Sequence, residues 1–188
     1  MDFELPLPGA TIELIAGRAH YERVMPEVME ARRSVWIATA NLKELMVHRP
    51  GVGRRRHFDS VLSVFAQLST RGVELRILHA GFPSKAFRRH FDRHPELVQG
   101  GLQLRLCPRV HSKLVIVDGR FVYLGSANWT GAGLGAKGEG RRNFELGIVS
   151  EDEAMLDALQ AYYQSLWEGQ PCAGCKLRDE CEAPLDGG

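Results

Sequence analysis

The stretch that decides the fold reads His111-Ser112-Lys113-Leu114-Val115-Ile116-Val117-Asp118, and the turn Gly125-Ser126-Ala127-Asn128 follows it closely. The apolar run between Lys113 and Asp118 predicts a buried strand, on which His111 and Lys113 point to the same face because they are two residues apart. A histidine can act as a nucleophile or as a general acid and base near neutral pH, and a neighbouring lysine can hold an anion. The turn adds a hydroxyl and an amide, so these residues together suit chemistry at a phosphate.

The order of these residues, H-x-K-x4-D followed by G-S-x-N, resembles the active-site signature of the phospholipase D superfamily, the HKD phosphodiesterases. The downstream run Arg142-Asn143-Phe144-Glu145 fits the same signature, so the densest likeness covers residues 107–148. The coarse order of strands and helices extends it over roughly residues 10–168. The resemblance implies an α/β fold, the phospholipase D-like domain, in which helices flank a mixed central β-sheet.

The resemblance also implies a catalytic role for most polar residues of the signature. His111 would attack phosphorus and form a covalent phosphohistidine, while Lys113 would hold the non-bridging oxygens. Ser126 and Asn128 would donate hydrogen bonds to the same oxygens, and Glu145 would accept the other ring N–H of His111. No metal or other cofactor is needed for this chemistry.

This mechanism needs a second histidine, because one imidazole cannot attack and also protonate the leaving group in the same step. Larger members of the superfamily carry two HKD motifs, whereas no other histidine of this chain has a lysine two residues on. We therefore expect a homodimer in which two His111 residues face each other across a two-fold axis. One would attack, the other would protonate the leaving group, and water would release the phosphohistidine.

Hydrophobic periodicity and turn residues predict alternating strands and helices. Asp118-Gly119 joins two strands as a hairpin, and we expect Asp118, although it belongs to the signature, to anchor this turn rather than touch the substrate. Ser150-Glu151-Asp152-Glu153 resembles a capping box that begins a helix ending near Trp167. Strands are expected at 11–16, 34–38, 73–78, 102–106, 113–117, 121–124 and 144–149, and further helices at 21–33, 58–68 and 84–94.

The length of 188 residues favours one catalytic domain, which we place at 1–168, followed by a small Cys-rich tail at 169–188. No apolar run approaches the ~20 residues needed to cross a membrane. The segment Met1-Asp2-Phe3-Glu4 lacks the basic and apolar regions of a signal peptide. A cytoplasmic location is therefore expected.

The net charge of +1 conceals an uneven distribution along the chain. Residues 1–149 hold 22 basic and 14 acidic side chains, whereas residues 150–188 hold 2 and 9. Nineteen of the 24 basic residues are arginine, which suits bidentate phosphate contacts. The distribution fits either an ordinary solvated surface or a basic face that attracts a polyanion, with candidate contacts at Arg54, Arg55, Arg56, His57, Arg88, Arg89 and Arg93.

Two features follow the Gly-Ser-Ala-Asn turn. Trp129 could stack on a base, but a role as a core or loop anchor is the expected one. Residues 131–140 contain five glycines and predict a flexible connection or a substrate-gating element.

The four cysteines suggest a metal site, because a C-x2-C-x5-C trio near the C-terminus joins a fourth that lies four residues before His111. They are Cys107, Cys172, Cys175 and Cys181. A structural zinc ion is the simplest interpretation, a [4Fe–4S] cluster is the alternative, and a tail without metal also stays open. The trio with a distant fourth cysteine resembles the iron–sulfur staple of some helicase–nuclease domains of an unrelated fold. His90 or His94 could replace Cys107 as a ligand.

Three functions remain open. A metal-independent nuclease acting on DNA or RNA is favoured by the small size, the single motif and the abundance of arginine. A phospholipase D-type lipid phosphodiesterase or transphosphatidylase would use identical chemistry, although no amphipathic membrane helix is evident. A non-catalytic nucleic-acid-binding module is disfavoured by the complete set of signature residues.

Overall fold

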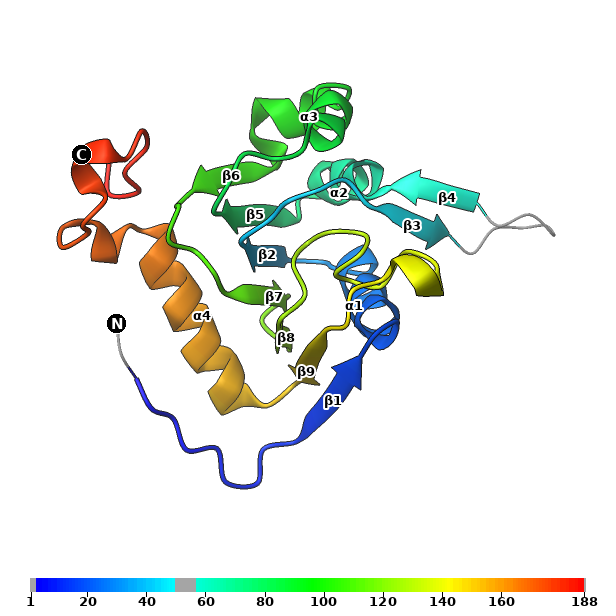
Figure 1. The fold of residues 1–188 in the computed structure, drawn as a ribbon, viewed down its shortest axis with the longest axis horizontal. Coiled ribbons are helices and arrows are strands. Elements are labelled where there is room, and N and C mark those ends of the chain that lie inside the picture. Colours follow the sequence, from blue (N-terminus) through cyan, green and yellow to red (C-terminus); the bar gives the residue numbers. More distant parts are fainter. Residues whose placement is uncertain (1–2, 50–56, 188) are drawn as a thin grey trace.

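A seven-stranded mixed β-sheet forms the centre of the computed structural model, which describes residues 3–49 and 57–187 (Figure 1). The strands are β1 (Ile12–Ala16), β2 (Ser34–Thr39), β5 (Glu74–His79), β6 (Gln103–Leu106), β7 (Lys113–Val117), β8 (Phe121–Gly125) and β9 (Leu146–Ser150). Their order across the sheet is β1-β9-β8-β7-β2-β5-β6. Strands β2, β5 and β6 run parallel, whereas each pair from β2 through β7, β8 and β9 to β1 is antiparallel, which confirms the predicted mixed sheet.

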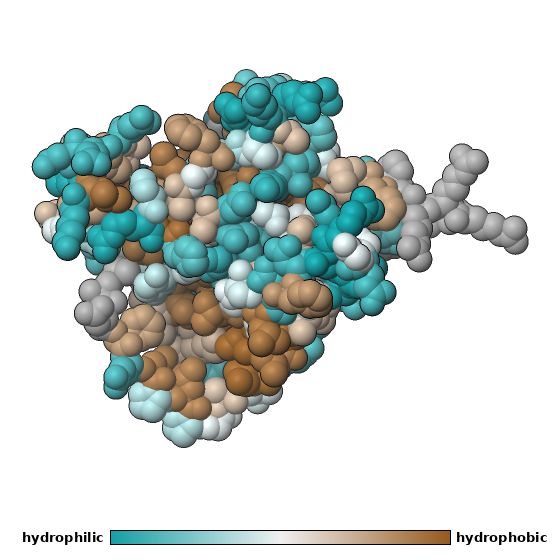
Figure 2. All heavy atoms as spheres, in the orientation of Figure 1, coloured by the Kyte–Doolittle hydropathy of each residue, from teal (hydrophilic) through white to brown (hydrophobic). Residues whose placement is uncertain are grey.

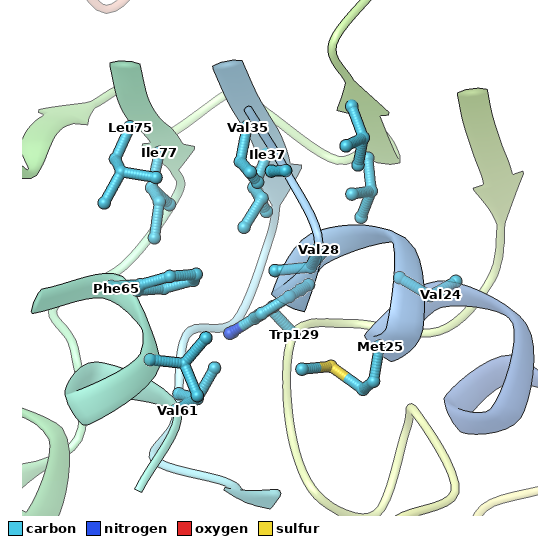
Figure 3. Close-up of a cluster of buried hydrophobic side chains, with 14 of the residues drawn as sticks. Val24, Met25, Val28, Val35, Ile37, Val61, Phe65, Leu75, Ile77 and Trp129 are labelled. Carbon is cyan, nitrogen blue, oxygen red and sulfur yellow. The ribbon is translucent and has the colours of Figure 1, made fainter. Parts of the chain in front are cut away.

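Two helices, α1 (Ala19–Met29) and α2 (Val61–Thr70), cover one face of the sheet. Figure 3 shows side chains of both helices meeting those of β2 and β5 around Trp129. The Trp129 ring is 2% exposed and stacks on Phe65 with ring centroids 5.9 Å apart. Trp129 is therefore a core anchor, as expected, and is not available to stack on a base.

One long helix, α4 (Glu153–Trp167), covers the opposite face (Figure 1). Its Tyr163 ring stacks on Trp36 at 5.3 Å, and the Arg76 guanidinium lies over Trp36 at 5.0 Å from the ring centroid. Aromatic stacking and cation–π contacts of this kind add to the hydrophobic stabilisation of a buried interface. The stack fixes α4 against β2 and β5, so the central strands are covered on both faces.

The smaller elements lie outside the central sheet. Strands β3 (Met46–Arg49) and β4 (His57–Ser60) form a separate two-stranded hairpin. The helix α3 (Lys85–Phe91) inserts Phe87 into the core. Short helical turns follow at Leu97–Gly101, Glu139–Arg141, Gln170–Cys172 and Arg178–Glu180. Among the ranges that the structure describes, no helix is long and apolar enough to cross a membrane.

The β1–β9 end of the sheet carries apolar side chains that α4 leaves exposed. Leu14 lies opposite Ile148 and Ala16 opposite Leu146, so these residues share the face that α4 covers further along the sheet. Leu14 is 72% exposed, Leu146 is 62% exposed, and Phe144 just before β9 is fully exposed. Figure 2 shows hydrophobic surface gathered over this part of the molecule. We call Leu14, Phe144 and Leu146 the apolar patch.

The helix expected at 58–68 begins later than predicted. Residues 57–60 pair with β3 as the strand β4, and α2 starts only at Val61. The Ser60 hydroxyl accepts a hydrogen bond from the Leu62 N–H at 3.1 Å and so caps the helix. The sequence prediction merged a strand and a helix because no glycine or proline separates them and Phe58 fits the apolar spacing of the helix.

The capping box predicted at Ser150 is wrong. The Asp152 carboxylate is the N-cap of α4 and accepts from the Met155 N–H at 2.9 Å. The Ser150 hydroxyl instead donates to the Thr11 carbonyl at 2.7 Å, so it ties the end of β9 to β1. Both residue types are good caps, and the pairing of β1 with β9 selects between them.

The C-terminal tail returns to the sheet beside β6. The Arg105 guanidinium donates to the carbonyl oxygens of Trp167 and Leu185, at 2.5 and 3.3 Å. The Leu185 side chain packs against the core under α4. The proposed division after residue 168 coincides with the end of α4, and whether the tail is a separate unit stays a prediction.

Candidate active site

The start of β7, the end of β8 and the start of β9 lie at the same end of the sheet, and they bring together all the signature residues except Asp118. Lys113 at the start of β7 lies opposite Gly125 at the end of β8, and Gly125 lies opposite Gly147 near the start of β9. His111 precedes β7 by two residues, and Asn128 follows β8 by three. Antiparallel pairing therefore places these residues, which are separated along the sequence, at the same end of the sheet.

Lys113 and His111 contact each other directly. The Lys113 Nζ lies 3.0 Å from Nδ1 and 3.3 Å from Nε2 of the His111 ring, and it donates to the His111 carbonyl at 2.5 Å. Lys113 is only 7% exposed, whereas His111 is exposed. Since an ammonium group can only donate, this contact favours a ring nitrogen with a free lone pair, which is the nucleophilic form of histidine.

The electrostatic environment of Lys113 combines burial with one nearby negative charge. Burial lowers the pKa of Lys113, and the Glu145 carboxylate acts in the opposite direction. A partly desolvated ammonium interacts more strongly with an anion than one in bulk water does. Lys113 is therefore placed to stabilise charge on a phosphate that binds above His111.

Glu145 lies at the site just before β9, but its hydrogen bonds differ from the bond to His111 that the family resemblance implies. Its Oε2 accepts from the Ser126 hydroxyl, and its Oε1 accepts from the Asn143 amide at 3.0 Å. Ser126 Oγ also accepts from the Leu146 N–H at 3.1 Å. Across the ranges described, no hydrogen bond joins Glu145 to His111, so a single chain does not make the contact that the family resemblance implies.

Asn128 is oriented by two groups at the end of β2. Its Oδ1 accepts from the Asn41 N–H at 3.0 Å and from the Thr39 hydroxyl at 3.2 Å. These bonds fix the carbonyl side of the amide inward, so the Nδ2 group is the end left to donate to a ligand. Thr39 also accepts from the Trp129 N–H at 2.9 Å. Sequence reasoning missed Thr39, since a threonine at a strand end carries no signal of its own.

Asp118 belongs to the signature but lies at the opposite end of β7. Its carboxylate accepts hydrogen bonds from the backbone N–H groups of Arg32, Arg33 and Ser34, at 2.7–3.1 Å. The five residues of β7 separate it from Lys113 by about 16 Å at ~3.3 Å per residue. Burial alone would raise the pKa of Asp118, but the three backbone donors outweigh it and hold the pKa below its ordinary value of 3.8. Asp118 anchors the hairpin and does not reach the other site residues.

Two glycines allow a tyrosine to pack directly beneath the site. A Cβ on Gly125 would lie 2.5 Å from the Tyr123 hydroxyl, and one on Gly147 would lie 2.6 Å from Tyr123 Cε2. The Tyr123 hydroxyl accepts from the Ala127 N–H at 3.3 Å, and burial raises the pKa of Tyr123 to about 12. The ring therefore stays neutral and supports the turn that carries Ser126.

The glycine-rich segment 131–140 is packed where it lies nearest Asn128. Gly131, Gly133 and Gly135 are buried. A Cβ on Gly133 would lie 2.6 Å from the Asn128 carbonyl oxygen. This half of the segment is therefore close-packed, in contrast to the flexible connection that its composition predicts.

A cavity of about 580 Å³, which we call the basic cavity, opens beside the same segment. Its lining includes the basic side chains of Arg18, Lys137 and Arg141. The aromatic rings of Tyr21 and Phe58 line it as well, and Phe58 is 48% exposed. The Glu44 carboxylate also lines the cavity, and none of the signature residues does. Its cations and accessible ring suit a ligand with phosphates and bases.

The predicted arginine contacts can be placed only in part. Residues 54–56 and the side chain of His57 lie outside the described residues. Arg88 and Arg89 are exposed on α3, and Arg93 is exposed just beyond it.

The four cysteines line one cavity of about 30 Å³ between the end of β6 and the tail, and all are free thiols. In the part of the chain that the structure describes, no group of three or more His, Cys, Asp or Glu is already arranged to hold a metal ion. His90 and His94 do not line this cavity; their Nδ1 atoms lie 3.7 Å from Glu44 and 3.4 Å from Glu96. Neither histidine is therefore an alternative to Cys107.

Comparison with known proteins places this chain in a family. A family model described as "Cardiolipin synthase, PLD-like domain" matches residues 24–167. The "Mitochondrial cardiolipin hydrolase" of Chlamydomonas reinhardtii is 26% identical over 110 residues, which make up 58% of this chain and 47% of that protein. The chain thus spans about half the length of this curated relative.

Two solved structures share the fold over most of their length. NucT from Helicobacter pylori matches with a TM-score of 0.60 at 19% identity, over 84% of this chain and 96% of NucT. Nuc from Salmonella typhimurium, a phospholipase D family member, matches with a TM-score of 0.59 at 17% identity, over 84% of this chain and 94% of Nuc. At these identities the likeness shows the fold alone.

Proposed function

The chain belongs to the phospholipase D superfamily of phosphodiesterases, and on this premise we propose that it is an endonuclease that cleaves DNA or RNA without a catalytic metal. The contact between the buried Lys113 ammonium and the exposed His111 ring carries the proposal. It supplies a nucleophile and a cation at the place where a phosphodiester would bind. Asn128, with its amide oriented by Thr39, supplies a neutral donor for the same oxygens.

The reaction proceeds in two balanced steps. A ring nitrogen of His111 attacks phosphorus, and the new P–N bond forms as the bond from phosphorus to the leaving oxygen breaks. The leaving oxygen takes a proton from His111 of a second copy of the chain. Water then attacks phosphorus, gives a proton back to that second ring, and releases the first histidine together with a phosphate monoester.

The second histidine comes from a homodimer, in which the apolar patch is the contact surface. The patch contains Phe144 and Leu146, the two neighbours of Glu145, so a copy that covers it also comes close to the site. Exposed apolar residues gathered in this way are typical of protein–protein contacts. In the dimer, the Glu145 carboxylate of one copy becomes available to the His111 ring of the other, a contact that the single chain does not make.

Nucleic acid is the favoured substrate because of the basic cavity. Lys137 and Arg141 can hold the phosphates that flank the scissile one, Arg18 is already paired with Glu22 at 2.7 Å, and Phe58 offers an accessible ring to a base. A lipid headgroup has one or two phosphates and no base, so it would use little of this surface. The excess of basic over acidic residues in positions 1–149 acts in the same direction.

A phospholipid substrate is the second candidate, and Phe144 is the observation that favours it. A fully exposed aromatic ring beside a catalytic carboxylate could enter the interface of a lipid bilayer. The family model and the curated relative also carry cardiolipin in their names. The proposed dimer explains the exposure of the Phe144 ring in a different way, because the partner copy would bury it.

The first experiment measures cleavage of fluorescent single- and double-stranded DNA and RNA in excess EDTA. Wild type is compared with His111→Ala and with His94→Ala, which removes a histidine that contacts none of the signature residues. Cleavage by wild type and His94→Ala but not by His111→Ala supports the nuclease proposal. Release of headgroups from cardiolipin vesicles, with nucleic acids left intact, would refute it in favour of the lipid function.

A second experiment tests the dimer by sedimentation velocity. Leu14→Asp places a charge in the apolar patch, and Val98→Asp places one on a 53% exposed valine elsewhere. We expect a dimer for wild type and Val98→Asp, and an inactive monomer for Leu14→Asp. A wild-type monomer with full activity would contradict the two-histidine mechanism.

A further inference from the structure

The four cysteines of the chain converge although they come from two distant segments. Cys107 follows β6, whereas the other three lie in the tail, more than 60 residues later. All four line the same cavity. Two disulfides would need two separate close pairs, but a single cavity lined by four free thiols has the donor set of a tetrathiolate metal site.

The local backbone explains why the tail presents its thiols to one side. The Cys175 N–H donates to the Cys172 carbonyl at 3.1 Å, the Arg178 N–H to Cys175 at 3.1 Å, and the Cys181 N–H to Arg178 at 3.2 Å. Successive i to i+3 bonds give about three residues per turn, so residues 172, 175, 178 and 181 lie on one side of the path. The C-x2-C-x5-C spacing fits this period, and these four residues all line the cavity.

We propose that Cys107, Cys172, Cys175 and Cys181 bind one structural Zn²⁺ ion. The space that all four thiols share is small, about 30 Å³, and fits a single ion. Zinc takes four thiolates at ~2.3 Å in tetrahedral geometry. No group of ligands is already arranged to hold a metal in the described part of the chain, so the proposed site requires small shifts of the thiols around this space.

Arg109 supplies a counter-charge for this centre. A zinc ion with four thiolates carries a net charge of −2, and such a charge needs nearby donors when it is partly buried. The Arg109 side chain donates a hydrogen bond to Cys175, and both Arg109 and Arg178 line the cavity. The guanidinium groups therefore lie where the negative charge of the site would develop.

The zinc ion clamps the tail to the segment that carries the nucleophile. The Cys107 N–H donates to the His79 carbonyl at 2.8 Å, and the Cys107 carbonyl accepts from the Val110 N–H at 2.9 Å. This turn leads directly into His111. The ion thus fixes the start of the 107–112 segment from outside the site and takes no part in the reaction, so this inference is independent of the substrate.

The test measures metal in protein purified under reducing conditions without chelators or added metal. Elemental analysis is expected to give about one zinc per chain, with no iron and no acid-labile sulfide. Exchange for Co²⁺ is expected to give the visible absorption of tetrahedral cobalt thiolate. Cys107→Ser and Cys181→Ser should each lose zinc, whereas Ala173→Ser, an added hydroxyl in the same turn, should retain it.

Three outcomes would overturn the proposal. Wild type without metal that also fails to take up Co²⁺ would show that no site exists. Iron and sulfide in equal amounts would show that the site holds an iron–sulfur cluster instead of zinc. Full zinc content in Cys107→Ser would show that Cys107 is not a ligand and that the ion does not join the tail to the His111 segment. The wild-type metal content and cobalt spectrum decide the first two outcomes even if a cysteine variant fails to fold.

Discussion

Thr39→Val tests whether the end of β2 positions the catalytic amide. Thr39 is 1% exposed, so valine fits the same space but removes the hydroxyl that binds the Trp129 N–H and Asn128 Oδ1. A buried N–H left without a partner costs about 1–3 kcal/mol. For a chain of this size that corresponds to a fall in Tm of about 2–4 °C for each kcal/mol.

The effect on activity follows from what remains around Asn128. The amide keeps its bond from the Asn41 N–H but loses the second anchor. Removing a charge-stabilising donor altogether, as Asn128→Ala does, costs about 100- to 1000-fold in kcat. A donor that is only displaced should lose part of this, about 10-fold in kcat with KM nearly unchanged.

The assay is a set of single-turnover cleavage rates and thermal melts for Thr39→Val, Thr39→Ser, Asn128→Ala and the Thr39→Val/Asn128→Ala double variant. Thr39→Ser keeps the hydroxyl and should restore kcat. If Thr39 acts through Asn128, adding Thr39→Val to Asn128→Ala should cause no further loss of kcat. A fall in stability with wild-type kcat would show that Thr39 supports the fold alone and would refute the positioning role.

Two further variants test the scaffold around the site. Asp118→Asn removes the anchor of the β7–β8 hairpin and should cost about 1 kcal/mol at neutral pH, a value reduced for partial exposure. Because the folded pKa of Asp118 lies below 3.8, its contribution to the free energy of unfolding is present above pH 3.8 and is lost as the pH falls through the folded value. In urea titrations, the free energy of unfolding of Asp118→Asn should therefore fall less below pH 3.8 than that of wild type. Parallel pH curves for the two proteins would contradict this. Gly147→Ala would place its Cβ 2.6 Å from Tyr123 and should cost about 1–3 kcal/mol, whereas Gly138→Ala, with nothing within 4 Å, should melt as wild type does; equal melting of both would show that Tyr123 can move aside.

Local spacing was sufficient to predict the parts of the site that lie in one hairpin. Lys113, Ser126 and Asn128 lie at the same end of the hairpin because β7 and β8 pair across a short turn, and the residues themselves specify both strands and the turn. The contact between His111 and Lys113 follows from their spacing of two. Both features follow from the alternation of side chains along a strand and from the pairing of a hairpin, and local sequence patterns predict both.

Contacts between distant segments could not be predicted in the same way. Thr39 is 89 residues from Asn128, and Asp118 binds N–H groups that are about 85 residues away. Both contacts depend on β2 pairing with β7, which no local pattern reveals. The choice of Asp152 over Ser150 as the N-cap also depends on a distant segment. The Ser150 hydroxyl binds the Thr11 carbonyl because β1 pairs with β9.

The position of the apolar patch connects the fold to the need for a second histidine. Glu145 directly precedes Leu146, the first residue of β9, so the two side chains leave the backbone at neighbouring positions. A partner that buries Leu146 must therefore sit beside the edge that holds Glu145, Ser126 and Lys113. The sheet end that α4 leaves uncovered is thus adjacent to the site, and the dimer that we propose would hide it and bring two His111 rings to one phosphate. The proposed dimer would supply the second histidine that a chain with one HKD motif lacks.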